Sequence, residues 1–273
     1  MQPAWQRARQ SPAAEHRPVA NNLTRALRNY ALVSPAGIVK EMPGMTLIAS
    51  GIRYAVFNAA ILNEPVITSV EELTGRLVAA SGFFLRQKMP WSCWVCRDHL
   101  SVQARSVADL VLQRHRLQCI AEHLGLEADQ LAPPTRKLPY LETRPVATPE
   151  TRRDFASVTG EAFDLPSSVS KQIYEGPGLW RGDYKRYIGY ANGCAVCTAA
   201  TCSGPEEIGL YSVGTAFAYR GRGYAETITR AVIGAAGQRR VTRSVLQSTP
   251  AGLGLYQRLG YQPVTSVLVY AMV

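Results

Sequence analysis

A turn rich in arginine and glycine is the stretch whose residue types most clearly suggest chemistry. It reads Arg220-Gly221-Arg222-Gly223-Tyr224-Ala225 and lies between a β-prone apolar segment, 208–215, and a helix-periodic segment, 224–236. The first amides of a helix have no partners within the helix and lie at the positive end of its dipole. Glycine allows close approach to the backbone, and the two arginines add charge. The turn is therefore predicted to bind an anion such as a pyrophosphate.

The turn alone is equally well explained as a solvated basic start of a helix. It is not a nucleotide P-loop, because no Gly-Lys-Ser/Thr follows, and it lacks the G-x-G-x-x-G spacing of dinucleotide sites. A second motif, LGLYQRLGY over 253–261, lies about thirty residues further on. We expect a short helix there, over 253–259, followed by a turn into a last strand region, 264–273.

The two motifs, in this order, resemble those of the GNAT acetyltransferases. Residues 220–225 fit the R/Q-x-x-G-x-G/A signature of that family, and 253–261 resembles its second motif, a short helix with a tyrosine and a Leu-Gly-Tyr/Phe turn. Asn192-Gly193, between apolar stretches 187–190 and 195–201, predicts a hairpin that resembles two further strands of the family. The resemblance covers about residues 140–273. It implies acetyl-CoA as co-substrate.

The resemblance also implies where acetyl-CoA binds. In that fold, the strand matching 208–215 diverges from the one matching 241–247, and the pantetheine amides pair with the open edge. Main-chain contacts are expected from Val213, Gly214 and Thr215. The pyrophosphate is expected on Gly221, Arg222, Gly223, Tyr224 and Ala225, with Arg220 adding charge. The segment 216–218, Ala-Phe-Ala, departs from the family, which often has a proline or an acidic residue there.

The implied reaction is direct attack of a primary amine on the thioester, with neither a metal nor an acyl-cysteine. Tyr256 occupies the position of the general acid of the family, and its alternative role is to pack against Leu259. The general base is less defined: Glu206 and Glu207, just before the strand expected at 208–215, are the candidate carboxylates, Glu207 being the one chosen, and Tyr211 lies within that strand. The amide of Val213 would stabilise the oxyanion.

The predicted fold class is α/β (α+β), with a GNAT-like mixed, mostly antiparallel sheet flanked by helices and a second N-terminal α/β domain. Residues 1–20 are interpreted as a flexible arm, 21–135 as a degenerate GNAT-like N-terminal domain and 140–273 as the catalytic domain. The segment 131–139, with three prolines, is the expected boundary. We hypothesise that the N-terminal half shapes the acceptor site.

Periodicity and capping residues predict the remaining elements. Ser69 and Glu72 form a candidate capping box at the start of a helix. Strands are expected within 45–62 and at 91–96 and 241–247, and helices at 22–33, 107–124, 149–163 and 167–175.

Two C-x-x-C pairs, Cys93/Cys96 and Cys194/Cys197, are the alternative candidates for a site. They lie far apart in probable strands, where residues i and i+3 face opposite sides, so buried cysteines are favoured over zinc. His115 and His123 are interpreted as one solvated helix face. Trp180 and Asp183 are candidates for the wall of an acceptor cleft.

The composition narrows the class of partner. Net charge is +10, but no basic run exceeds a pair such as Arg239-Arg240, which disfavours a nucleic-acid surface. No apolar run is long enough to span a bilayer, and the first residues do not resemble a signal peptide, so a cytoplasmic protein is expected. The expected partners are acetyl-CoA and a small-molecule amine, with no nucleic acid or membrane partner. A non-catalytic acyl-CoA-binding sensor or scaffold is the alternative.

Overall fold

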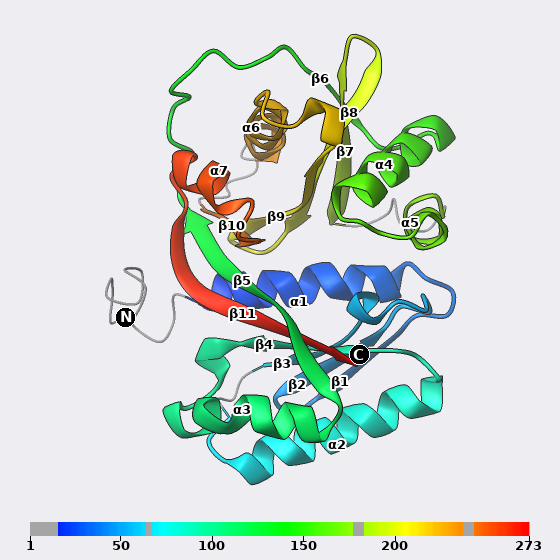
Figure 1. The fold of residues 1–273 in the computed structure, drawn as a ribbon, viewed down its shortest axis with the longest axis vertical. Coiled ribbons are helices and arrows are strands. Elements are labelled where there is room, and N and C mark those ends of the chain that lie inside the picture. Colours follow the sequence, from blue (N-terminus) through cyan, green and yellow to red (C-terminus); the bar gives the residue numbers. More distant parts are fainter. Residues whose placement is uncertain (1–15, 64–66, 177–182, 237–242, 273) are drawn as a thin grey trace.

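The computed structural model describes residues 16–63, 67–176, 183–236 and 243–272 of the chain. One mixed sheet runs through the molecule, with strand order β1-β2-β3-β4-β11-β5-β10-β9-β8-β7-β6. Figure 1 shows a lobe built on β1–β4, α2 and α3 (the N-terminal lobe) and a lobe built on β6–β10 and α4–α7 (the C-terminal lobe), with α1 between them.

The strands are β1 (Ile38–Met42), β2 (Met45–Ala49), β3 (Asn58–Leu62), β4 (Ser92–Cys96), β5 (Leu117–Ala128), β6 (Glu142–Pro145), β7 (Tyr184–Ala191), β8 (Cys194–Ser203), β9 (Glu207–Thr215), β10 (Arg243–Ser248) and β11 (Gln262–Met272). The helices are α1 (Arg17–Leu32), α2 (Val70–Gln87), α3 (Val102–Arg114), α4 (Pro149–Ala162), α5 (Ser167–Tyr174), α6 (Tyr224–Ala236) and α7 (Leu253–Arg258).

The two lobes repeat one arrangement of strands. In the N-terminal lobe, β1, β2 and β3 form an antiparallel meander, and α2 leads to β4, which pairs parallel to β3. In the C-terminal lobe, β7, β8 and β9 form the same meander, and α6 leads to β10, parallel to β9. The predicted fold class is therefore correct, and the N-terminal lobe is a second α/β unit of the same design.

Strand β11 lies in a place that its sequence position does not suggest. It pairs antiparallel with both β4 and β5 and so separates two strands that are neighbours along the chain. In turn, β5 pairs with β10 of the C-terminal lobe. Figure 1 shows β5 and β11 running together from one lobe to the other. The segment 131–139 contains neither helix nor strand, and the division of domains there stays a prediction.

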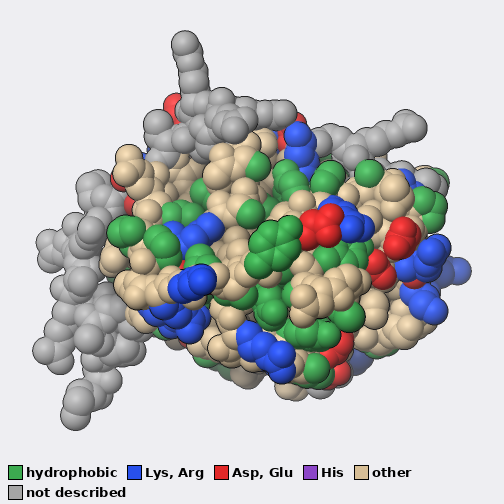
Figure 2. All heavy atoms as spheres, turned by 90° about the horizontal axis from the view of Figure 1, so that it is seen from above, with side chains coloured by type: hydrophobic (Ala, Val, Ile, Leu, Met, Phe, Trp, Pro, Cys, Tyr) green, Lys and Arg blue, Asp and Glu red, His purple; other side chains and the backbone are tan. Residues whose placement is uncertain are grey.

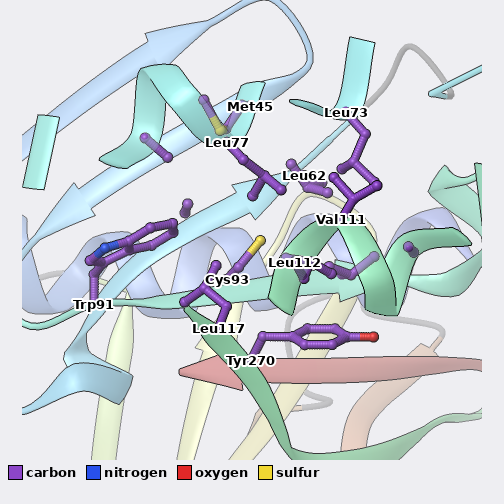
Figure 3. Packing of buried hydrophobic residues seen from close by; sticks show 14 of the residues in the cluster. Met45, Leu62, Leu73, Leu77, Trp91, Cys93, Val111, Leu112, Leu117 and Tyr270 are labelled. Carbon is purple, nitrogen blue, oxygen red and sulfur yellow. The ribbon is translucent and has the colours of Figure 1, made fainter. Parts of the chain in front are cut away.

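The core of the N-terminal lobe shows why β11 is held there. Side chains of β2, β3 and β4 pack beneath α2 and α3, and Tyr270 of β11 closes the cluster (Figure 3). Tyr270 is buried, and its hydroxyl donates to Asp109 of α3. Burial of apolar side chains of this size contributes about 1.5–3 kcal/mol each, so the last strand of the chain stabilises the first lobe.

Two sequence predictions need correction. The helix expected over 107–124 ends at Arg114, and 117–128 is a strand. Arg116 has φ 60, which no continuing helix tolerates, and this turns the chain into β5. The helix expected at 22 begins at Arg17, with a proline in its first turn, so 17–20 belong to α1 rather than to an arm. His16 is the N-cap of α1, and residues 1–15 lie outside the described residues.

The other predicted elements are confirmed within a few residues. Ser69 caps α2 by accepting from the amide of Glu72. The carboxylate of Glu72 accepts from the amide of Thr68 rather than from that of Ser69, so the predicted capping box forms only in part. Asn192 and Gly193 both have positive φ, as a tight hairpin turn requires. The last strand region is one strand, β11, over Gln262–Met272.

Candidate acyl-CoA cleft and adjoining cavity

A split between β9 and β10 forms the centre of the site. The two strands pair from Glu207↔Arg243 to Leu210↔Leu246, and no further. On its other edge, β9 is irregular between the pairs Thr198↔Gly214 and Ala200↔Tyr211, so that an extra residue bulges. Ser212, in this bulge, has φ 49, and its carbonyl accepts from the Thr198 hydroxyl at 2.8 Å. The bulge turns the end of β9 away from β10, as the resemblance implied.

A cleft of about 720 Å³ opens at the split. Nine of the residues proposed from the sequence line this cleft: Val213, Gly214, Thr215, Arg220, Gly221, Gly223, Tyr224, Ala225 and Tyr256. Arg222 is not among the lining residues, and its guanidinium lies 5.5 Å from the centre of the Tyr219 ring. The end of β9, the glycine turn and Tyr256, which are separate in sequence, therefore meet in one cleft.

The turn before α6 has the backbone that an anion site needs. Gly221 and Gly223 have φ 74 and 92, a region that favours glycine. Arg220 braces this turn: its guanidinium lies 4.0 Å from the centre of the Phe217 ring and donates to the carbonyl of Thr215 at 3.1 Å. Its charge is thereby fixed near the cleft. The Ala-Phe-Ala departure forms a short 3₁₀ turn, Phe217–Tyr219.

The proline-rich segment supplies a residue that sequence reasoning missed. Arg136 lines the cleft, and its guanidinium lies 4.0 Å from the carboxylate of Glu226 in the first turn of α6. Arg230 holds this carboxylate at 2.8 Å and donates to the carbonyl of Ala132 at 2.6 Å, which fixes the segment to α6. An arginine among prolines carries no motif, so the sequence offered no signal for this role.

Tyr256, on α7, lies in the wall of the cleft with its ring largely buried. Its ring centre is 5.7 Å from that of Tyr261. Burial raises the pKa of the Tyr256 phenol above its usual 10, so the hydroxyl keeps its proton at neutral pH. A protonated phenol in this position can donate to a developing thiolate.

The structure does not bring Glu207 to the cleft. Glu207 begins β9, at the opposite end of the strand from Val213. It is buried, and its carboxylate accepts from the side-chain amide of Asn22 at 3.0 Å. Asn22 also accepts from the hydroxyl of Tyr211, so this group of side chains anchors α1 to β9. Glu206, the other candidate carboxylate, is exposed and does not line the cleft.

A second hollow, of about 410 Å³, adjoins the cleft. Phe163 and Thr249 line both hollows. Its wall includes Tyr211, and also His123, which lies on β5 rather than on the predicted helix face. We call it the aromatic cavity.

The remaining candidates lie elsewhere. Asp183 lines a third hollow, beside Arg25 and Arg28 of α1, and Trp180 lies outside the described residues. His115 caps the end of α3. Cys93 is buried in β4 and Cys197 in β8, and burial raises the pKa of each thiol to about 12.

One group within the described residues could offer three ligands to a metal. The ligand atoms of His16, Cys96 and His99 lie within 4.8 Å of one another, and all three residues are buried. The thiol of Cys96 also lies 3.2 Å from the hydroxyl of Thr265, and Nδ1 of His99 lies 2.8 Å from the carbonyl oxygen of Leu62. None of the three lines the cleft or the aromatic cavity. This group joins the start of α1 to β4.

The surface charge is mixed. Figure 2 shows basic side chains interspersed with acidic and apolar ones on the face seen from above. Within the described residues, no helix is both long and apolar enough to cross a membrane.

Comparison with known proteins agrees with this geometry. Residues 156–261 match the model of the acetyltransferase (GNAT) family. No curated protein matches the chain. A GCN5-related N-acetyltransferase from Kribbella flavida has a similar structure, with a TM-score of 0.71 at 16% identity over 94% of this chain and 95% of that one.

Two further structures share the fold over most of the chain. A putative GNAT-family acetyltransferase from Novosphingobium aromaticivorans has a TM-score of 0.55 at 16% identity, over 92% of this chain and 99% of that one. A tandem GNAT protein from the clavulanic acid biosynthesis pathway has a TM-score of 0.55 at 11% identity, over 96% of both chains. The C-terminal half of this chain, at residues 156–261, thus contains an acetyltransferase domain of the GNAT family.

Proposed function

We propose that the protein transfers an acetyl group from acetyl-CoA to a primary amine by direct attack of the amine on the thioester. The observation that carries this proposal is the split between β9 and β10, which ends beside the glycine turn of α6. An open strand edge and a helix N-terminus in one cleft suit the two ends of one ligand, an amide chain and a pyrophosphate.

The residues of the cleft fit acetyl-CoA. Val213, Gly214 and Thr215 follow the bulge and border the split, so their backbone is available to the pantetheine amides. Gly221 has open space around its α-carbon, and its backbone faces the cleft beside the N-terminus of α6. Arg136 adds a half-exposed positive charge for the phosphates.

The proposed reaction needs few groups. The amine nitrogen, in its neutral form, forms the new C–N bond while the C–S bond breaks. In this proposal, the amide of Val213 stabilises the charge that develops on the carbonyl oxygen. Tyr256 donates its phenolic proton to the leaving sulfur, and a base removes the extra proton from nitrogen. The products are then coenzyme A in its thiol form and the acetylated amine, with the proton lost by nitrogen held by the base.

A matched pair of variants at Gly221 tests the cleft. Aspartate and asparagine tolerate positive φ better than most residues, and a β-carbon at this position meets no atom within 4 Å. Gly221→Asp places a negative charge beside the phosphates and should weaken acetyl-CoA binding roughly tenfold to a hundredfold. Gly221→Asn should bind within a few-fold of the natural protein.

Titration calorimetry with acetyl-CoA measures both variants. Equal affinities of the two variants, or no binding by the folded natural protein, would remove the cleft as the acyl-CoA site. Binding without release of free coenzyme A across a broad set of amines would favour the sensor or scaffold, to which the absence of Glu207 from the cleft already lends weight.

A further inference from the structure

The aromatic cavity adjoins the cleft at Phe163 and Thr249, and none of the residues of the glycine turn, 220–225, lines it. Its walls come from both lobes, with α1 between them: Leu27 and Tyr30 belong to α1, and Trp94 belongs to β4. Gln247 and Thr249 bring in the end of β10, where the split begins. An acyl group held in the split would therefore lie between the cleft and this cavity.

The described lining of the cavity carries no Asp, Glu, Lys or Arg. Eight of its lining residues are aromatic: Tyr30, Tyr54, Phe57, Trp94, Phe163, Tyr174, Tyr184 and Tyr211. Such a wall gains free energy by covering an apolar group and cannot neutralise an ammonium ion with a carboxylate. The cavity favours an acceptor whose amine is carried on an aromatic or apolar body.

His123 is the one described lining residue whose ordinary pKa lies near neutrality. Its Nδ1 atom is buried and has no hydrogen-bond partner within the described part of the chain. Its ring centre lies 6.4 Å from that of Trp94. Burial lowers the pKa of the imidazole, opposed by a weaker hydrogen-bond contribution from the backbone of Ser248, so His123 is neutral at pH 7.

The other ionisable side chains that line the described part of the cavity are phenols. Tyr211 of β9 and Tyr184 of β7 have phenols whose pKa values burial raises well above 10. The neighbour of His123 on β5, Glu122, pairs with Arg97 at 3.7 Å and does not line the cavity. A neutral imidazole with a buried, unpartnered nitrogen can accept a proton.

We propose that the aromatic cavity is the acceptor site, that it takes a primary amine on an aromatic or apolar body, and that the imidazole of His123 removes the proton from the amine nitrogen. This inference rests on the proposed acetyl transfer. His123 gains the proton that nitrogen loses, and Tyr256 gives one to sulfur. Exchange with solvent then restores both side chains.

The test compares 2-phenylethylamine with glucosamine, a polar primary amine, as acceptors for the full chain. The kcat/KM for phenylethylamine should be about tenfold or more higher, because only its body gains from burial. Ala121→Phe, a substitution in the cavity wall on β5, should abolish this preference while acetyl-CoA affinity by calorimetry stays unchanged. Equal use of the two amines by the natural protein would overturn the substrate class.

His123→Gln tests the base. It should lower kcat roughly 10²–10⁴-fold and remove the acidic limb of the pH profile of kcat, which otherwise falls as pH drops below the usual imidazole range. Added imidazole should restore part of the rate in His123→Gly. His115→Gln, at the end of α3, is the matched control with unchanged kinetics.

The pH profiles of the same variants also test Glu207 as the alternative general base. If Glu207→Gln removes the acidic limb and His123→Gln keeps it, the assignment to His123 is wrong. Binding of the amine is measured separately from acetyl transfer, by the quenching of tryptophan fluorescence on addition of phenylethylamine. This measurement tests the cavity even if the protein does not transfer acetyl groups. Quenching that Ala121→Phe abolishes retains the cavity as an amine site, and no quenching overturns it.

Discussion

Tyr256 and Tyr261 have touching rings but different surroundings. Tyr256 lines the cleft, whereas the Tyr261 hydroxyl lies 2.7 Å from the hydroxyl of Ser244 in the core. Tyr256→Phe should lower kcat about 100-fold, because the thiolate loses its proton donor, with unchanged acetyl-CoA affinity. Tyr261→Phe should instead lower the free energy of unfolding by about 1 kcal/mol with little change in kcat.

Steady-state assays and denaturant unfolding of both variants separate the two effects. Equal loss of kcat in both would show that Tyr256 acts through packing. The reverse pattern, with the larger loss at Tyr261, would exclude Tyr256 as the acid.

Residues of the glycine turn could be predicted from sequence because their role is a backbone role. Gly221 and Gly223 are needed for positive φ, and that need is visible in the residue type. The role proposed for His123 could not be predicted from the sequence, because it depends on β5 passing the end of β10, and the apolar spacing near His123 had indicated a helix. Glu207 was a reasonable candidate from its place before β9, but its partner, Asn22, lies 185 residues away.

At the scale of elements, the packing of α4 on β9 depends on Gly214. A β-carbon there would lie 2.7 Å from Cβ of Ala162, at the end of α4. Gly214→Ala should therefore lower the free energy of unfolding by about 1–3 kcal/mol. Gly234, in α6, has open space around it, so Gly234→Ala should raise stability by about 0.5–1 kcal/mol. Thermal unfolding of the two variants should show shifts of opposite sign.

A gain of stability in both variants would mean that α4 moves to admit the methyl group at position 214. The contact between α4 and β9 would then be adaptable. The requirement for glycine at position 214 would come from the cleft and not from the packing of α4.

The elements of the C-terminal lobe could be predicted well because their signals are local. A capping threonine starts α4, and Asn192-Gly193 sets the hairpin. The bulge at Ser212 could not be predicted, because positive φ is typical of glycine or asparagine and serine gives no sign of it. The partners of β11 were also hidden, because strand pairing between distant segments leaves no local pattern.

The two lobes are joined through β5 and β11. β11, from the end of the described chain, pairs with β4 of the N-terminal lobe, and β5, which follows the N-terminal lobe in sequence, pairs with β10 of the C-terminal lobe. A fragment of residues 140–273 lacks β5 and leaves both β10 and β11 with an open edge. We expect it to aggregate without a cooperative thermal transition. A fragment of residues 115–273, which restores β5, should show such a transition by circular dichroism. Cooperative unfolding of the shorter fragment would show that the C-terminal lobe needs no partner strand.

The position of β11 has a consequence for the order of events on the ribosome. The N-terminal lobe is synthesised first, yet β11, the strand that lies between β4 and β5, is translated after all the other strands of the sheet. Until β11 has been synthesised, β4 and β5 must either remain apart or pair wrongly with each other. From the completion of β5 to the synthesis of β11, a nascent chain of this protein therefore exposes two strands with unpaired edges, and a chaperone that shields them would raise its yield.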